Sequence, residues 1–440
     1  MFPCPFPVRR QIVRLPGNAV LFALLVSCLV QLYGDEMLYI PASSYRMGTD
    51  THLPDERPAH FVFISSLYCD KYEISLSFWE EVAQWALAND YAFDSRVQTA
   101  KNGPSYSPAP RQHPMNMVTW FDAVKWSNAR SEKEGRTPVY YENTELTKVY
   151  RKGDLNLSND HVNWFSSGYR LPTEAEWEKA ARGGLVGTKY SWGENLDGSK
   201  GNYRLSGDPF DNGSTPVGYF DGNQLITERY SSYGGQHFPP FKCINGYGLF
   251  DVFGNVSEWC WDWYDPEWYG NPFTKDINSF AVVSDNLGPS TVPTDGIVGG
   301  TRVIRGSSFQ HDDVLGGGNA LRIAYRHQRK PTTANRALGF RCVRSDIKEK
   351  IWFDAFTLAS SDEKWKHLDW FGTFYQSDYH WIYHSTLGWI YPEGEGSFDN
   401  WLFIEGLDWL WTSSAVYPYV FSPLSGGAWL WYDRSRTESQ

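Results

Sequence analysis

Cysteine gives this sequence its widest range of possible chemistry, because a thiol can form a disulfide, ligate a metal or act as a nucleophile. Beyond the first 34 residues four cysteines remain, namely Cys69, Cys243, Cys260 and Cys342. No two of them are spaced as C-x-x-C, so the spacing gives no support to a zinc ribbon or a thioredoxin-like centre. Four cysteines allow three disulfide pairings, and the spacing does not choose among them.

Residues 1–34 have the layout of a secretory signal. Basic residues precede an apolar run over residues 18–33, and Asp35 and Glu36 follow directly. The run is shorter than the ~20 residues of a transmembrane helix, so we expect export without a membrane span. Cleavage near Gly34 is one outcome. The residues ending at Cys28 also resemble a bacterial lipobox, in which Cys28 would carry a lipid anchor.

Composition limits the partners and the architecture. The 440 residues are 17% aromatic and include 39 Gly and 25 Pro, which favours loop-rich, tightly turned domains over helical bundles. The net charge of −11 argues against nucleic acid as a partner. An exported, acidic protein is expected in the periplasm, at the outer membrane or outside the cell.

Three helices are predicted from caps and apolar periodicity. Ser75 or Ser77 can cap the first, and Thr119 can cap the second, which should end near Gly135. Residues 173–176 form a full capping box for the third. We expect these helices to act as scaffold.

The chain divides near residue 346 by composition. Residues 37–345 are a mixed segment that contains the four cysteines, residues 346–364 are expected to be a linker, and residues 365–435 form a tryptophan-rich module. In that module, short aromatic runs alternate with Gly, Pro, Ser and Asp turns and repeat loosely every 28 residues, as from Trp381 to Trp409. This pattern predicts stacked β-hairpins, either as a sugar-binding surface of exposed rings or as a small core that docks on the main domain.

Eight motifs occur in the order found in one enzyme family. They are Tyr45-Arg-Met-Gly48, Asp55-Glu-Arg-Pro-Ala-His60, Asp70-Lys-Tyr-Glu-Ile-Ser75, His113-Pro-Met-Asn-Met-Val-Thr-Trp-Phe-Asp-Ala123, Gly168-Tyr-Arg-Leu-Pro-Thr-Glu-Ala-Glu-Trp-Glu178, Gly246-Tyr-Gly-Leu-Phe-Asp-Val-Phe-Gly-Asn-Val-Ser-Glu-Trp259, Arg305-Gly-Ser-Ser-Phe309 and Leu338-Gly-Phe-Arg-Cys-Val343. Residues 37–345 thus resemble the formylglycine-generating enzymes, or sulfatase-modifying factors. The resemblance implies an α+β fold with a C-type-lectin-like core and little regular secondary structure, followed here by an all-β hairpin module.

The resemblance also defines the chemistry that this chain lacks. The enzymes oxidise a sulfatase cysteine within C-x-P-x-R to an aldehyde, using two cysteines that bind copper(I). His311 stands at the position of the first of these cysteines, and no cysteine occurs between Cys260 and Cys342. Copper is therefore not expected. A replacement metal site at His311, Asp312 and Asp313 is one interpretation, and a polar turn is the other.

The resemblance further suggests a ligand cleft. Its candidate lining residues are Trp259, Arg305, Ser308, Arg322 and Arg326. Two interpretations remain open: these residues accept an extended peptide or another anionic ligand, or the arginines form ion pairs that cover the core.

Calcium is expected as a structural cofactor by the same resemblance. Asp251 and Glu258, with the carbonyls of Gly254 and Val256, match one calcium site of the family, and hard oxygen ligands suit this ion. The positions of a second site correspond to Asn202 and Tyr203, with Asp208 or Asp211 for the charge.

Two disulfides of the family are absent. Ser127 stands where the enzymes have the partner of Cys342, and Ala181 and Ile323 occupy the positions of the other pair. Cys342 is thus either free or bonded to a different cysteine such as Cys260.

The sequence therefore predicts an exported, calcium-bound family member that acts as a non-oxidase binding or accessory protein of the cell envelope. Its ligand would be a protein, a peptide or an envelope glycan. The alternative is a divergent oxidase that still converts a sulfatase cysteine to formylglycine, or another chemistry at His311.

Overall fold

The structure is a computed structural model of the 440-residue chain. The residues it describes are 36–94, 110–210, 212–224, 239–270, 283–284, 287–293, 300–311, 320–346, 357–358, 364–368, 370–376, 381–394, 400–404, 407–413, 416–423 and 428–431. The leader with Cys28 lies outside them, as do Asp211, Asp312 and Asp313. Within them, no helix is long and apolar enough to cross a membrane.

The three predicted helices are confirmed, and each begins at a predicted cap. In α2 (Leu76–Ala88), the Ser75 hydroxyl accepts from the Phe78 amide. In α4 (Trp120–Lys133), the hydroxyl of Thr119 accepts from the amide of Asp122. In α5 (Glu174–Arg182), both bonds of the capping box are present, and Gly183 ends the helix in the left-handed region.

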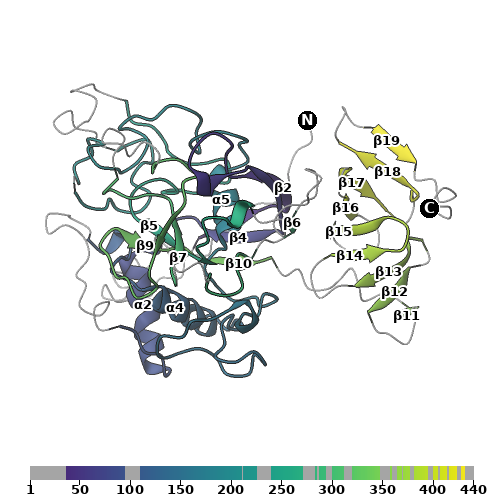
Figure 1. Cartoon of the computed structure of the whole chain (residues 1–440), viewed down its shortest axis with the longest axis horizontal. Helices are drawn as coiled ribbons and strands as arrows, with labels where there is room; N and C mark the ends of the chain where they lie inside the picture. Colours follow the sequence, from purple (N-terminus) through teal and green to yellow (C-terminus); the bar gives the residue numbers. More distant parts are fainter. Residues whose placement is uncertain are drawn as a thin grey trace, which may run out of the picture.

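The main domain contains three small sheets around these helices (Figure 1). The first has β1 (Met37–Ile40), β4 (Leu67–Asp70) and β10 (Val343–Ser345), all antiparallel. The second has β2 (Ser43–Met47), β3 (His60–Ile64) and β6 (Val283–Ser284). The third has the order β8 (His327–Arg329), β7 (Arg302–Arg305), β5 (Ser257–Trp263) and β9 (Leu338–Gly339).

Short 3-10 turns complete the regular structure of this domain. They are η1 (Pro54–Glu56), η2 (Pro110–Gln112), η3 (Asn159–His161) and η5 (Trp268–Gly270). Strand β5 is buried along its whole length, and its tryptophans contact both α4 and the loops. The core is therefore centred on β5. Aromatic side chains from loops and short elements, rather than long helices or strands, pack around it.

The tryptophan-rich segment forms one antiparallel sheet, as the predicted hairpins require (Figure 1). Its order follows the chain from β11 to β19. The strands are β11 (Thr357–Leu358), β12 (Trp365–Leu368), β13 (Gly372–Gln376), β14 (Ile382–His384), β15 (Gly388–Gly394), β16 (Asn400–Ile404), β17 (Asp408–Thr412), β18 (Tyr419–Ser422) and β19 (Ala428–Trp431). Strand β11 lies in the segment that the sequence predicted as a linker.

The two faces of this sheet differ in chemistry. One face is aliphatic and forms its own core, with Phe374, Ile382, Ile390 and Leu402 fully buried. The other face is aromatic, because the alternate positions of most strands are Trp, Tyr or Phe.

Phe63 of β3 attaches the sheet to the main domain. Its ring lies among aromatic side chains of the sheet, with centroids 5.1 Å from Trp381, 5.0 Å from Tyr391 and 4.8 Å from Phe403. Ala42 is buried in the same cluster. The module thus docks on the main domain, while Trp389 and Trp401, on the same aromatic face, remain exposed.

Candidate functional site

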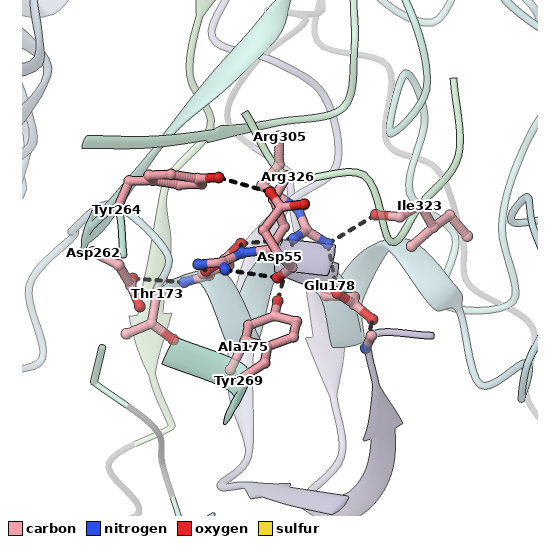
Figure 2. A network of polar contacts seen from close by, with 12 residues as sticks. Asp55, Thr173, Ala175, Glu178, Asp262, Tyr264, Tyr269, Arg305, Ile323 and Arg326 are labelled. Carbon is pink, nitrogen blue, oxygen red and sulfur yellow. Dashed lines mark hydrogen bonds and ion pairs between the residues drawn. The ribbon is translucent and has the colours of Figure 1, made fainter. Parts of the chain in front are cut away.

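Helix α5 carries two buried acids that bind arginines from β7 and the loop before β8 (Figure 2). The guanidinium of Arg305 lies 2.7 Å from a carboxylate oxygen of Glu174 and 2.5 Å from one of Glu178. Arg326 lies 2.7 Å from Glu174. Burial alone would raise the pKa of Glu178, but Arg182 and Arg305 outweigh it and hold this pKa at about 2.

These contacts bear on the two interpretations of the predicted cleft residues. Arg305, Arg326 and Arg322 are all buried, and Arg322 makes a bidentate pair of 2.6 and 2.8 Å with Glu56. Trp259 is also fully buried, and its ring N–H donates to the carbonyl of Val118. Each of these arginines pairs with an internal carboxylate, which favours the second interpretation, that of ion pairs covering the core. A ligand cleft at these residues stays a prediction.

Ser308 and His311 follow directly after β7. Gly306 and Ser307 both have positive φ, which turns the chain so that the Gly306 carbonyl accepts from the Gly254 amide. The Ser308 hydroxyl, itself buried, lies 3.0 Å from Nδ1 of His311. This turn therefore positions the His311 ring, and its backbone at Gly306 and Phe309 contacts the loop predicted to bind calcium.

A second histidine, which the sequence analysis missed, lies beside His311. The rings of His311 and His327 have centroids 6.3 Å apart and meet edge to face. The Arg329 guanidinium lies 2.6 Å from Nε2 of His327. Burial, then Arg329 and His311, lower the pKa of His327 to about 4, so this imidazole is neutral at physiological pH. Pairing of β8 with β7 brings His327 here, opposite Ile304.

The four cysteines beyond the leader are free. The hydroxyl of Ser127 lies 3.4 Å from the sulfur of Cys342, in agreement with the position inferred from the family resemblance. Ala181 and Ile323 belong to one buried apolar cluster, so packing replaces the other family disulfide. Burial raises the pKa of all four thiols, that of Cys342 to about 12. As neutral thiols they are poor metal ligands and nucleophiles.

The predicted calcium loop is compact and rich in buried acid. Gly254 has a positive φ and approaches the backbone of Asn202 so closely that a Cβ there would lie 2.2 Å from the Asn202 carbonyl oxygen. Asp251 accepts from the Gly218 amide, and Glu258 makes a bidentate pair with Arg341. Glu73, also buried, accepts from the amide of Val256.

Three buried acids, Glu73, Asp251 and Glu258, lie near the guanidinium of Arg341. Burial raises the pKa of Glu73 well above its usual range and that of Asp251 to about 6. A divalent cation held by Asp251 and loop carbonyls would favour the charged forms of these acids. Nevertheless, no three His, Cys, Asp or Glu side chains among the described residues are grouped as a ready-made metal site.

The residues predicted for a second calcium are engaged in local contacts. The side-chain amide of Asn202 donates to the carbonyl of Gly213, and Tyr203 is buried. Asp208 accepts from the Ser206 hydroxyl and the Phe210 amide, which fixes its own turn. Asp211 lies outside the described residues, so the second site stays a prediction.

Comparison with known proteins settles the family. A family model described as the sulfatase-modifying factor enzyme 1-like domain matches residues 26–346. The chain belongs to this family. The formylglycine-generating enzyme of Thermomonospora curvata is 31% identical over 323 residues, which cover 70% of this chain and 92% of that protein. The enzyme of the same name from Streptomyces coelicolor is 37% identical over 191 residues, 41% of this chain and 51% of that protein.

Other relatives carry different names. The serine/threonine-protein kinase pkn1 of Chlamydia caviae is 26% identical over 319 residues, which cover 70% of this chain. The chain spans 38% of the length of that kinase and 51% of the Streptomyces enzyme. Among solved structures, Treponema denticola variable protein 1 superposes with a TM-score of 0.48 and 23% identity, over 70% of this chain and 94% of that one.

Proposed function

We propose that this sulfatase-modifying factor family member is exported and acts as a binding or accessory protein of the cell envelope, without copper-dependent oxidation. One observation carries the proposal. At the position of the first copper cysteine stands His311, held by Ser308 and packed against His327. A linear copper(I) site needs two soft thiolates. Here the neighbouring group is the imidazole of His327, and its Nε2 already accepts a hydrogen bond from Arg329.

The proposed binding surface consists of the partly exposed residues around His311 and His327, and it does not include the buried arginines. His327 and Arg329 are half-buried, and the exposed Arg336 lies over the ring of Phe309 at 5.5 Å. The guanidinium groups of Arg329 and Arg336 favour anionic partners. An acidic peptide segment or an acidic envelope glycan fits this chemistry best.

Copper binding tests the proposal. The purified protein would be titrated against a colorimetric copper(I) chelator, and it is expected to leave the metal with the chelator. In the family's enzymes the second copper cysteine lies five residues after the first, so a matched variant, His311→Cys combined with Gly316→Cys, rebuilds the pair. It is expected to withdraw about one copper per chain. Withdrawal of copper by the unsubstituted protein would contradict the proposal.

A divergent oxidase is the second candidate, and one observation favours it. His327 lies close enough to His311 for two imidazoles to approach one ion, and imidazole is a ligand of copper. If the unsubstituted protein retains copper and His327→Ala abolishes this, the second candidate replaces the first.

Calcium and export complete the proposal. Calcium would neutralise the acids around Asp251 and thereby stabilise the loop that bonds to Gly306 and Phe309, in the same turn as Ser308 and His311. Export rests on the signal-like residues 1–34, and a lipid anchor on Cys28. Lipid labelling of the wild type in cells, with Cys28→Ala as the control, tests the anchor. Equal labelling of both chains, or none of either, would contradict it.

A further inference from the structure

The last strand of the aromatic sheet has a partner on one side. Strand β19 pairs with β18 and ends the strand order, and Figure 1 shows it at one end of the stack. Among the described residues no strand pairs with its other side. The backbone N–H and C=O groups on such an edge are a template for another strand.

The aliphatic core of the sheet is incomplete at this edge. Along that face Ile382, Ile390, Leu402, Leu410 and Val420 are at most 8% exposed. Leu430 lies directly opposite Val420 and therefore on the same face, yet it is 41% exposed. Leu430 is exposed because β19 has a neighbouring strand on one side, whereas the inner strands have one on each side.

The described residues of this edge, 428–431, also lack the usual protection against pairing. Natural edge strands carry charged residues or proline, whereas β19 consists of Ala, Trp, Leu and Trp. On the aromatic face, Trp429 and Trp431 are 55% and 61% exposed. A repeat array normally ends in a polar cap, and the described residues of β19 do not supply one.

We propose that β19 pairs antiparallel with β19 of a second copy of this chain, so that two aromatic sheets continue into one. The strand is self-complementary in one register. With Leu430 opposite the partner's Leu430, Trp429 faces the partner's Trp431 and the reverse. This repeats the pattern of the sheet itself, where Val420 faces Leu430 and Tyr419 faces Trp431.

Other registers fit less well. A slip by one residue would join the aliphatic face of one sheet to the aromatic face of the other. A slip by two would place Trp429 opposite the partner's Trp429 and leave Trp431 outside the paired segment. The contact is one short strand pair, smaller than the ~1,200–2,000 Å² of stable interfaces, so the dimer forms reversibly as concentration rises.

Sedimentation velocity of the full chain over a range of concentrations tests the association. The wild type is expected to change from monomer to dimer, and Leu430→Lys to remain a monomer. Trp389→Lys is the matched control, since Trp389 is also exposed on this sheet but lies on the inner strand β15. Unchanged melting of both variants verifies the fold. A wild type that stays monomeric, or equal association of Leu430→Lys, overturns the proposal.

Cysteine cross-linking tests the register. Opposite residues have Cβ atoms about 4.5–5.5 Å apart, within reach of a disulfide. Leu430→Cys is expected to form a covalent dimer on mild oxidation. Trp429→Cys and Trp431→Cys are each expected to stay monomeric alone and to cross-link when mixed. Cross-linking no greater than that of the unsubstituted chain, or a covalent dimer from Trp429→Cys alone, overturns the proposed pairing. This inference does not depend on the proposed function.

Discussion

The imidazoles of His311 and His327 lie edge to face, with ring centroids 6.3 Å apart. They come from the turn after β7 and from β8, two segments that the third sheet of the main domain brings together. The family's enzymes have the first of their copper thiolates at the position of His311. The same scaffold here presents two imidazoles and the Arg329 guanidinium instead, and the proposal of a non-oxidase rests on this difference.

Loss of the Arg305 guanidinium is expected to destabilise the main domain strongly. Arg305→Ala would leave Glu174 and Glu178 short of a buried counter-charge, at a cost of about 3–5 kcal/mol. Arg46→Ala is the control, because its pair with Asp50 is half-exposed and worth about 1 kcal/mol or less. Urea denaturation measures both. Similar midpoints for the two variants would show that the buried network contributes little.

Asp262 gives the fold a predictable pH dependence. Burial, with the nearby Glu174 charge, raises the pKa of Asp262 to about 8, whereas an unfolded aspartate titrates near 3.9. The folded protein therefore holds a proton that the unfolded chain releases, and the free energy of unfolding falls as pH rises from about 4 to 8.

Asp262→Asn removes this titration while keeping an acceptor for the Glu174 amide. It is expected to stabilise the protein by up to about 5 kcal/mol at pH 8, since one pKa unit corresponds to about 1.4 kcal/mol, and to change little near pH 4. Melting temperatures across this pH range measure the difference. Asp160→Asn, at an exposed site, should show no such trend. A constant effect of Asp262→Asn at all pH values would mean that Asp262 is ionised in the folded state.

Phe63 is expected to hold the aromatic sheet on the main domain. Phe63→Ala removes the ring that contacts Trp381, Tyr391 and Phe403 and should make the chain between the two parts more open to protease. Phe61→Ala is a matched control on the same strand, since Phe61 is 46% exposed. Limited proteolysis followed by mass spectrometry compares them. Equal cleavage rates would show that Phe63 does not fix the module.

Removal of calcium is expected to lower the melting temperature. An ion present at 100 times its dissociation constant stabilises a protein by about 2.7 kcal/mol, and a chelator abolishes this gain. Asp251→Asn should make the melting temperature insensitive to the chelator. An unchanged midpoint of the wild type after chelation would contradict a structural calcium.

Features that depend on residues close together in the chain could be predicted from the sequence. Contacts between residues far apart in the chain could not. Helix caps such as Ser75 and Thr173 act within one turn, so they could be predicted directly. The place of His327 beside His311 follows from the register of β8 against β7, which no local pattern encodes. The burial of Arg322 likewise depends on Glu56, which is 266 positions away in the chain.

In the aromatic sheet, too, the local structure could be predicted and the long-range contact could not. Its alternation and turns predicted hairpins, and the sheet confirms them. That Phe63, rather than a tryptophan of the tail, would fill the centre of the contact could not be predicted, because Phe63 lies in an apolar strand like many others. Motif spacing likewise could not decide whether Arg305 binds a ligand or pairs with an acid in the core, since both uses require a buried or half-buried guanidinium.

We infer that this scaffold does not oxidise cysteine through copper. The most direct measurement incubates the purified protein with a C-x-P-x-R peptide, copper and oxygen, and follows the aldehyde by mass spectrometry. The formylglycine-generating enzyme of Streptomyces coelicolor would be the positive control. We predict that the peptide keeps its cysteine while the control converts it. Formation of the aldehyde by this protein, and its loss in His311→Ala, would contradict the account.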